Sequence, residues 1–395
     1  MKKVSAFLFA LIVFAMIPAT ALHASAAVDP ESLRGTTVYV YNWGEYISDG
    51  SEGTLDVNKE FENRYGIHVE YTNYASNEDM YAKLSGGGAN YDVIIPSDYM
   101  IERMIAEDML EKLDFSNIPN YKYIPEEYKG LYFDPKDEYS IPYTFGMVGL
   151  IYNTTMVDEV PDSWSVMWDE KYADKILNFN NPRDAFAVAQ FLLGIDINSE
   201  DPADWQKAAD KLKEEKPLVQ SYVMDEVYNK MENGEAAIAP YYAGDYLTML
   251  ENNEDLGFVY PKEGTNVFVD SMCIPKGAQN KAAGELYINF MLETDIATAN
   301  ANAICYGCPH TGVQANEDYD LKDSEVIYSE ADFKTEYFHN LSPETLALMT
   351  SLWDELKIDG GSNVGVYIAL VAVVLIVVVI AVVGVVRKKR RANQL

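Results

Sequence analysis

Cysteine is scarce in this chain, which contains only Cys273, Cys305 and Cys308 among 395 residues. Small extracellular domains with insufficient cores depend on many disulfides, and three cysteines exclude such a framework. Histidine is also rare, at four residues, and the single C-x-x-C motif has no second pair to complete a zinc site. The chain must therefore fold around a hydrophobic core, which its length permits.

Basic residues are also scarce relative to acidic ones. The sequence has 30 Lys and Arg against 62 Asp and Glu, a net charge of −32 at pH 7. Seven of the basic residues lie near the two ends, which leaves 23 for the region between them and a net charge there of about −39. This balance excludes nucleic acid as a partner, because phosphates require Lys and Arg contacts. It favours cationic ligands.

The motifs of several common enzyme classes are also absent. There is no Walker loop, no H-E-x-x-H metal-binding helix and no G-x-S-x-G nucleophile elbow. The sequence has no internal repeat and no low-complexity tract. We therefore expect a protein that is not an enzyme and that has no metal and no cofactor.

The N-terminus has the three parts of a secretory signal peptide. Lys2 and Lys3 precede an apolar run that continues to Ile17, and residues 24–26 are small. This order of charged, apolar and small residues predicts cleavage near residue 26.

The C-terminus predicts a membrane anchor. Residues 364–386 are 23 uninterrupted uncharged and mostly branched residues. At about 1.5 Å per residue, they span a hydrocarbon core of roughly 30 Å. The basic cluster at residues 387–391 places the tail, residues 387–395, in the cytoplasm. With residues 359–363 as a linker, we expect a single-pass protein whose folded region lies on the outer face of the cytoplasmic membrane.

The region between the two ends alternates strand-like and helix-like segments. Residues 37–41 and 92–95 read as strands, and Val57, Phe61 and Tyr65 fall four apart on one face of a helix. Repeated β-α-β units predict an α/β fold with an open, mostly parallel sheet covered by helices.

Two lobes are expected, because about 330 residues exceed one ordinary α/β domain. Residues 139–152 and 267–274 read as long extended segments that could cross between the lobes. The predicted binding domain spans residues 36–358, with lobe 1 at about 36–143 and 271–318 and lobe 2 at about 144–270 and 319–358.

Aromatic and acidic residues gather at the predicted strand ends. Trp43, Glu45 and Tyr46 follow the first strand, and Ser97 and Tyr99 follow a later one. Ligands of open α/β sheets bind at the carboxyl ends of strands. Aromatic faces attract cations, and a carboxylate neutralises their charge. The pattern therefore favours a cationic and partly apolar ligand over a purely structural role.

Five motifs give this chain a family resemblance. They are YNWGEY at residues 41–46, SNEDMYAKL at 76–84, YDVIIPS at 91–97, YSIPY at 139–143 and DSMCIP at 270–275. Together these motifs resemble those of the spermidine/putrescine-binding proteins, the solute-binding components of polyamine ABC importers. The resemblance runs from about residue 38 to 357.

The resemblance implies a two-lobed periplasmic-binding-protein-like fold of type II that closes over an extended polyamine, with hinges at the crossovers. It also implies ABC permease subunits as partners, and we expect the protein to be a monomer. The implied ligand residues are Trp43, Glu45, Tyr46, Ser97, Tyr99, Asn181, Asp184, Tyr242, Phe268, Asp270, Tyr306 and His339.

The chain departs from the spermidine binder of the family at three positions, two of which are among these ligand residues. Asn181 stands where that protein has Asp, Phe268 where it has Trp, and Gly44 where it has Thr. With one anchoring charge fewer, the sequence leaves open which polyamine is preferred.

Two alternatives remain open at this stage. A ferric-ion binder of the same fold would use adjacent tyrosines such as Tyr241 and Tyr242 as phenolate ligands. A membrane-tethered thiol oxidoreductase would use Cys305 and Cys308, although no thioredoxin-like strand–motif–helix context precedes them. The sequence does not decide whether these two cysteines form a disulfide.

Overall fold

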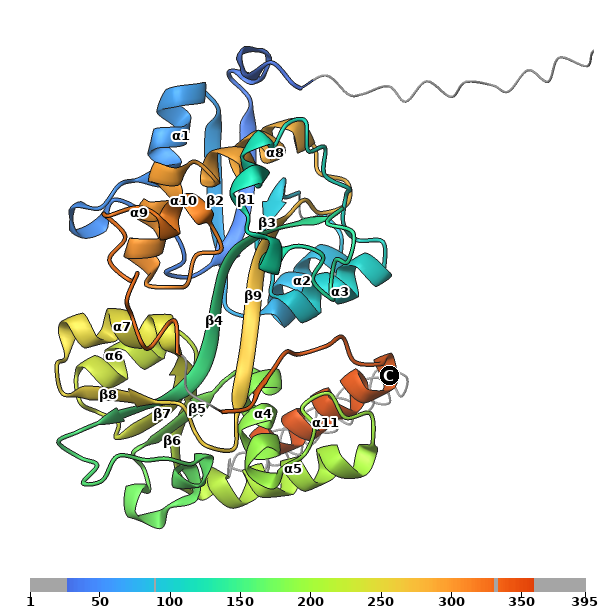
Figure 1. The fold of residues 1–395 in the computed structure, drawn as a ribbon. Helices are drawn as coiled ribbons and strands as arrows, with labels where there is room; N and C mark the ends of the chain where they lie inside the picture. Colours follow the sequence, from blue (N-terminus) through green and yellow to red (C-terminus); the bar gives the residue numbers. More distant parts are fainter. Residues whose placement is uncertain (1–26, 89, 330–332, 359–395) are drawn as a thin grey trace, which may run out of the picture.

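The computed structural model describes residues 27–88, 90–329 and 333–358. Its strands form one twisted path in the order β2-β1-β3-β9-β4-β7-β5-β6, with β10 added to β9 and β8 added to β4. Figure 1 shows two α/β halves, one above the other, joined by the long strands β4 and β9. The predicted signal peptide, membrane helix and basic tail lie outside the described residues.

The upper half begins with three parallel strands. Its elements are β1 (Thr37–Trp43), α1 (Val57–Tyr65), β2 (His68–Tyr74), α2 (Asn77–Ser85), β3 (Val93–Ile94) and α3 (Asp98–Ala106). The α1 helix begins at the side-chain cap of Asp56 and ends at Gly66, whose φ of 64° suits glycine. Helices α8 (Lys281–Met291), α9 (Thr294–Ile304) and α10 (Thr311–Gln314) return to this half (Figure 1).

The two halves are joined by β4 (Ser140–Asn153) and β9 (Thr265–Cys273). These strands pair antiparallel from Ser140 opposite Cys273 to Met147 opposite Val267, with an irregularity between Pro142 and Thr144. The sequence predicts a mostly parallel sheet, and this is right for β2, β1 and β3 in the upper half and for β6, β5 and β7 in the lower half, whereas β7 and β8 both pair antiparallel with β4. The centre is antiparallel because the chain crosses from one half to the other and later crosses back.

The lower half contains most of the remaining elements. They are β5 (Ile176–Phe179), α4 (Pro182–Leu193), α5 (Pro202–Glu215), β6 (Val219–Val223), α6 (Glu226–Glu232), β7 (Ile238–Tyr242), α7 (Ala243–Asn252), β8 (Leu256–Val259) and α11 (Pro343–Ile358). Strand β10 (Thr335–Glu336) pairs with β9 on the way to α11. Short 3₁₀ helices lie at Pro30–Leu33, Ser51–Gly53, Pro119–Tyr123, Glu126–Tyr128, Trp164–Trp168, Glu170–Tyr172 and Lys216–Leu218.

Buried apolar side chains stabilise both halves. In the upper half Phe61 packs edge-on against Tyr287 and Phe290, which ties α1 to α8. In the lower half Trp205 of α5 is fully buried against Phe186 of α4. Each such aromatic side chain contributes about 1.5–3 kcal/mol when it leaves water. The two rigid halves therefore hold in place the side chains that face each other across their boundary.

None of the helices within residues 27–88, 90–329 and 333–358 has the length and apolar character needed to cross a bilayer.

Candidate functional site

A cavity of about 700 Å³ lies between the two halves, and residues of both halves and of the crossing strand β9 line it. We call it the cleft. Residues from the ends of β1, β3, β5 and β7 line it, together with residues of β9. Ten of the residues expected from the sequence line the cleft: Trp43, Tyr46, Ser97, Tyr99, Asn181, Asp184, Tyr242, Phe268, Asp270 and Tyr306.

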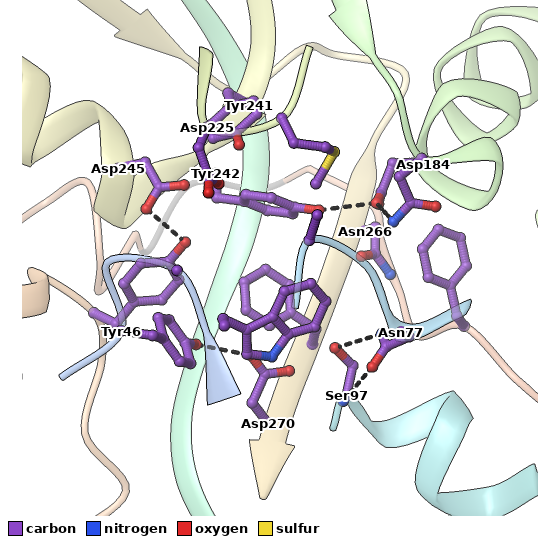
Figure 2. Close-up of a pocket in the computed structure, with 18 of the residues that line it drawn as sticks. Tyr46, Asn77, Ser97, Asp184, Asp225, Tyr241, Tyr242, Asp245, Asn266 and Asp270 are labelled. Atoms are coloured by element: carbon purple, nitrogen blue, oxygen red, sulfur yellow. Dashed lines mark hydrogen bonds between the residues drawn. The ribbon is translucent and has the colours of Figure 1, made fainter. Parts of the chain in front are cut away.

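Asp270 lies on β9 at the base of the cleft (Figure 2), and its carboxylate is buried at 4% exposure. Its backbone forms an isolated antiparallel bridge with Ser97, which fixes the start of α3 against β9. The Tyr46 hydroxyl donates a hydrogen bond of 2.7 Å to Oδ2, while Oδ1 has no hydrogen-bond partner among the described residues. Burial raises the pKa of Asp270 to about 6, although the nearby hydroxyls of Ser97 and Tyr46 partly offset this.

Asp184 occupies the first turn of α4, at a second position in the cleft. Asn181 caps this helix by accepting a bond from the Arg183 amide, and Pro182 stands at its first position. The Asn181 side chain donates a 2.6 Å bond to Asp184 Oδ2, and the Tyr242 hydroxyl donates a second bond of 2.9 Å to the same oxygen. Burial raises the pKa of Asp184 to about 7.

Asp245 supplies a third carboxylate, from the first turn of α7. The Tyr306 hydroxyl donates a 3.0 Å hydrogen bond to Asp245 Oδ1. Burial raises the pKa of Asp245 to about 7, and the charges of Asp225 and Glu45 act in the same direction. In Figure 2, Asp184 and Asp245 lie on opposite sides of Tyr242.

Aromatic rings form the walls between these carboxylates. The ring centroids of Tyr46 and Tyr306 are 5.1 Å apart, and those of Tyr242 and Phe268 are 5.5 Å apart, both in edge-to-face contact. Trp43 is fixed by a 2.9 Å hydrogen bond from its indole nitrogen to the Ile95 carbonyl. Apolar walls held this rigidly suit hydrocarbon segments or cationic groups of a ligand.

Two of the expected residues do not line the cleft. Glu45 has a φ of 48° and lines a neighbouring groove outside the cleft. His339 packs on Tyr132 at 4.3 Å between ring centroids, and its side chain is 48% exposed. The preceding residue, Phe338, lines the cleft instead.

The structure adds lining residues that the sequence reasoning missed. They are chiefly Asn77, Asp98, Asp225, Tyr228, Tyr241, Asp245 and Asn266. A signal for Asp245 was present, because it follows the strand-end Tyr242 by three residues and so falls in the first turn of the next helix. Asp225 and Asn266 had no comparable signal, because their positions depend on how the two halves meet.

The charged residues among the described lining of the cleft are all acidic. Asp98, Asp184, Asp225, Asp245 and Asp270 line it, and no Lys or Arg is among its described lining residues. Carboxylates that lose contact with water without gaining a counterion are unfavourable in the charged form, and the pKa values of all five are raised. The arrangement can therefore bind a ligand that brings several positive charges and apolar segments between them.

The structure also describes the residues that a thiol oxidoreductase or a ferric-ion binder would use. Cys273, Cys305 and Cys308 are all free and buried. No group of three His, Cys, Asp or Glu side chains suited to a metal ion occurs in the part of the chain that the structure describes. Burial raises the pKa of both Tyr241 and Tyr242 well above the usual value, which disfavours the phenolate form that ferric ion requires.

Comparison with known proteins assigns the family. Residues 89–333 match the model for bacterial extracellular solute-binding proteins. The chain is 32% identical over 327 residues to the spermidine/putrescine-binding periplasmic protein 1 of Haemophilus influenzae, covering 81% of this chain and 89% of that one. It is 26% identical over 343 residues to the putrescine-binding periplasmic protein PotF of Escherichia coli, covering 81% of this chain and 91% of that one.

A solved structure agrees with these matches. The putative spermidine/putrescine ABC transporter protein of Listeria monocytogenes is 34% identical, with a TM-score of 0.77, over 82% of this chain and 99% of that one. The periplasmic-binding-protein-like fold and the resemblance that the motifs suggested are thus confirmed. On the family match and these identities, the chain belongs to the bacterial extracellular solute-binding proteins.

Proposed function

We propose that this protein captures a linear polyamine such as spermidine or putrescine in the cleft and delivers it to an ABC importer. The observation that carries the proposal is a set of three carboxylates, the buried Asp184 and Asp270 and the half-buried Asp245, in an aromatic cleft whose described lining has no basic residue. The names of the relatives support the same ligand class.

The chemistry of a polyamine matches this lining. Each ammonium group needs a carboxylate or several acceptors, because burying it unpaired costs several kcal/mol. Each methylene group gains roughly 0.8 kcal/mol on burial. Asp270, with its free and buried Oδ1, is suited to a central ammonium, while the aromatic walls of Tyr242 and Phe268 cover the methylene segments.

The proposed working cycle is a hinge closure. Lobe 1, at about residues 36–143 and 271–318, and lobe 2, at about residues 144–270 and 319–358, would rotate about β4 and β9. Because the carboxylates repel one another without a ligand, a bound polyamine would favour the closed form, and the permease subunits would recognise it.

We also propose how the protein is retained at the membrane. Residues 364–386 are apolar enough to span a bilayer, and basic residues follow them directly. The first cysteine after the signal segment is Cys273, so no cysteine near the new N-terminus is available to carry a lipid. The folded region would therefore be held on the outer face by its C-terminal helix, as a monomer.

Isothermal titration of the full-length protein in nonionic detergent tests the proposal. Putrescine, spermidine and spermine are the ligands, with lysine and ferric citrate as controls. We expect saturable binding of at least one polyamine with a Kd in the micromolar range or below, and no saturable binding of the controls. Absence of binding to all three polyamines would refute the proposal, and a visible phenolate–iron band with ferric citrate would support the iron alternative.

A further inference from the structure

Asp225 stands at the first position before α6 but does not cap that helix. Aspartate at this position ordinarily accepts a hydrogen bond from an amide of the first turn. Here the Asp225 side chain makes no such bond. No hydrogen bond or ion pair engages its carboxylate among the described residues, and it lines the cleft instead (Figure 2). The Asp225 side chain therefore has no evident role in stabilising the fold.

The carboxylate of Asp225 reaches across the boundary between the two halves. A Cβ atom placed on Gly44, which follows β1 in the upper half, would lie 2.6 Å from Asp225 Oδ2. Gly44 therefore leaves the space that the carboxylate occupies. Gly44 and Asp225 together form one end of the cleft, which we call the mouth.

The mouth opens into a second cavity of about 2180 Å³, the outer groove. Tyr46, Asp225 and Tyr228 line both the cleft and the outer groove, so the two cavities are adjacent at these residues. The groove is lined by Glu45, Asp49, Asp225, Glu232, Glu251 and Asp320, and no Lys or Arg is among its described lining residues.

An acidic surface alone does not identify a binding site, but here it continues a cleft that carries separate evidence for a cation. Asp270 Oδ1 is buried and unpartnered in that cleft. The negative charge of Asp225 also contributes to the raised pKa of Asp245, because the two carboxylates repel each other. A cation between them would relieve this repulsion.

We propose that Asp225 is the outermost ammonium anchor of this protein, and that it favours polyamines long enough to extend through the mouth into the outer groove. This inference rests on the proposed function and adds the preferred length of the ligand. A diamine carries two ammonium groups, which two of the three carboxylates Asp184, Asp245 and Asp270 can neutralise. A tetraamine carries two more, and the mouth offers the next carboxylate along the path.

The first experiment compares ligands of different length. Full-length wild type and Asp225→Asn are titrated with putrescine, spermidine and spermine. Because Asp225 is partly exposed to water, we expect a moderate loss for spermine, about threefold to tenfold. The loss for putrescine should stay within twofold. Asp255→Asn makes the same charge change at an exposed side chain that lines neither cavity, and should leave all three affinities unchanged.

The second experiment uses the contact with Gly44. In Gly44→Ala the new methyl group must displace the Asp225 carboxylate, because they would otherwise be 2.6 Å apart. We expect this variant to lose spermine affinity, and we expect the double variant Gly44→Ala/Asp225→Asn to lose less than the product of the two single losses. Thermal melts establish that each variant is folded.

The outcomes separate this inference from the proposed function. If wild type binds none of the polyamines, the proposed function itself fails. If wild type binds and Asp225→Asn weakens all three ligands equally, or none of them, the inference fails while the proposed function stands. An equal loss in Asp255→Asn also overturns the inference, since it would assign the effect to overall charge.

Discussion

Replacing Asp270 by Asn should separate ligand binding from stability. The change removes the charge but keeps the shape of a side chain that is 4% exposed. In the complex, an ammonium group would lose a buried partner, which costs about 2–5 kcal/mol. This corresponds to a loss of polyamine affinity of roughly 30-fold or more, since each 1.4 kcal/mol is a factor of ten.

The free protein should respond in the opposite direction. The pKa of Asp270 is raised to about 6, against an unperturbed value of about 3.9. A raised carboxyl pKa lowers the free energy of unfolding as the pH rises from the unfolded pKa through the folded pKa. At pH 8 the ionised Asp270 thus costs about 3 kcal/mol, at 1.36 kcal/mol per unit. Asn removes this cost, so the variant should be at least as stable as wild type at pH 8.

The assay is titration of both proteins with spermidine and putrescine, together with thermal melts without ligand at pH 8 and pH 4. The stability advantage of Asp270→Asn should shrink to about 0.5 kcal/mol near pH 4, where wild-type Asp270 is protonated in the folded state. Binding within threefold of wild type would remove Asp270 from the site. A large drop in melting temperature at pH 8 would show that its charge stabilises the fold, contrary to this reasoning.

Two further predictions follow from the same geometry, and a third follows from the C-terminal sequence. Polyamine affinity should fall as the pH is lowered from 8 to 5, because Asp184 and Asp245 have pKa values raised to about 7 and must be ionised to bind a cation. Titration in two buffers of different ionisation enthalpy should detect protons released on binding at pH 7, and their absence would contradict the shifts. Asn181→Asp places a second carboxylate beside Asp184, where the amide now donates a 2.6 Å bond, and should change the spermidine-to-putrescine affinity ratio by roughly threefold or more. An unchanged ratio, measured by the same titrations, would remove this position from the site. Deleting residues from Asn363 onward should release a folded, ligand-competent protein into the culture medium, and a truncated protein still pelleting with membranes would refute the C-terminal anchor.

Individual strands and helices could be predicted from the sequence, because their starts and ends depend on neighbouring residues. The β1 strand ends where Trp43 begins the aromatic loop, and α1 starts at a capping Asp56 and ends at Gly66. The crossing strands were also predicted, since residues 139–152 and 267–274 read as long extended segments. The antiparallel centre was not predicted, because it depends on pairing between segments more than one hundred residues apart.

The site was predicted best where a residue belongs to a motif. Asp270 follows a β-branched strand within DSMCIP, and the structure places it in the cleft as expected. Glu45 also belongs to a motif, but its φ of 48° turns the chain so that it lines the outer groove. His339 was expected from the family resemblance alone, and its neighbour Phe338 lines the cleft instead. Backbone conformation is a property that residue identity alone does not determine.

The electrostatics of the cleft explain why a two-lobed binder should tolerate an unfavourable interior. Asp184, Asp245 and Asp270 come from three different elements, and each has its pKa raised by burial. Bringing them together without a counterion opposes closure, whereas a polyamine supplies positive charges for the carboxylates and apolar segments for the walls between them. The same groups that destabilise the empty closed form would then stabilise the loaded one. A permease that recognises the closed form would therefore respond to ligand through the carboxylates themselves, and neutralising any one of them should make closure depend less on the polyamine.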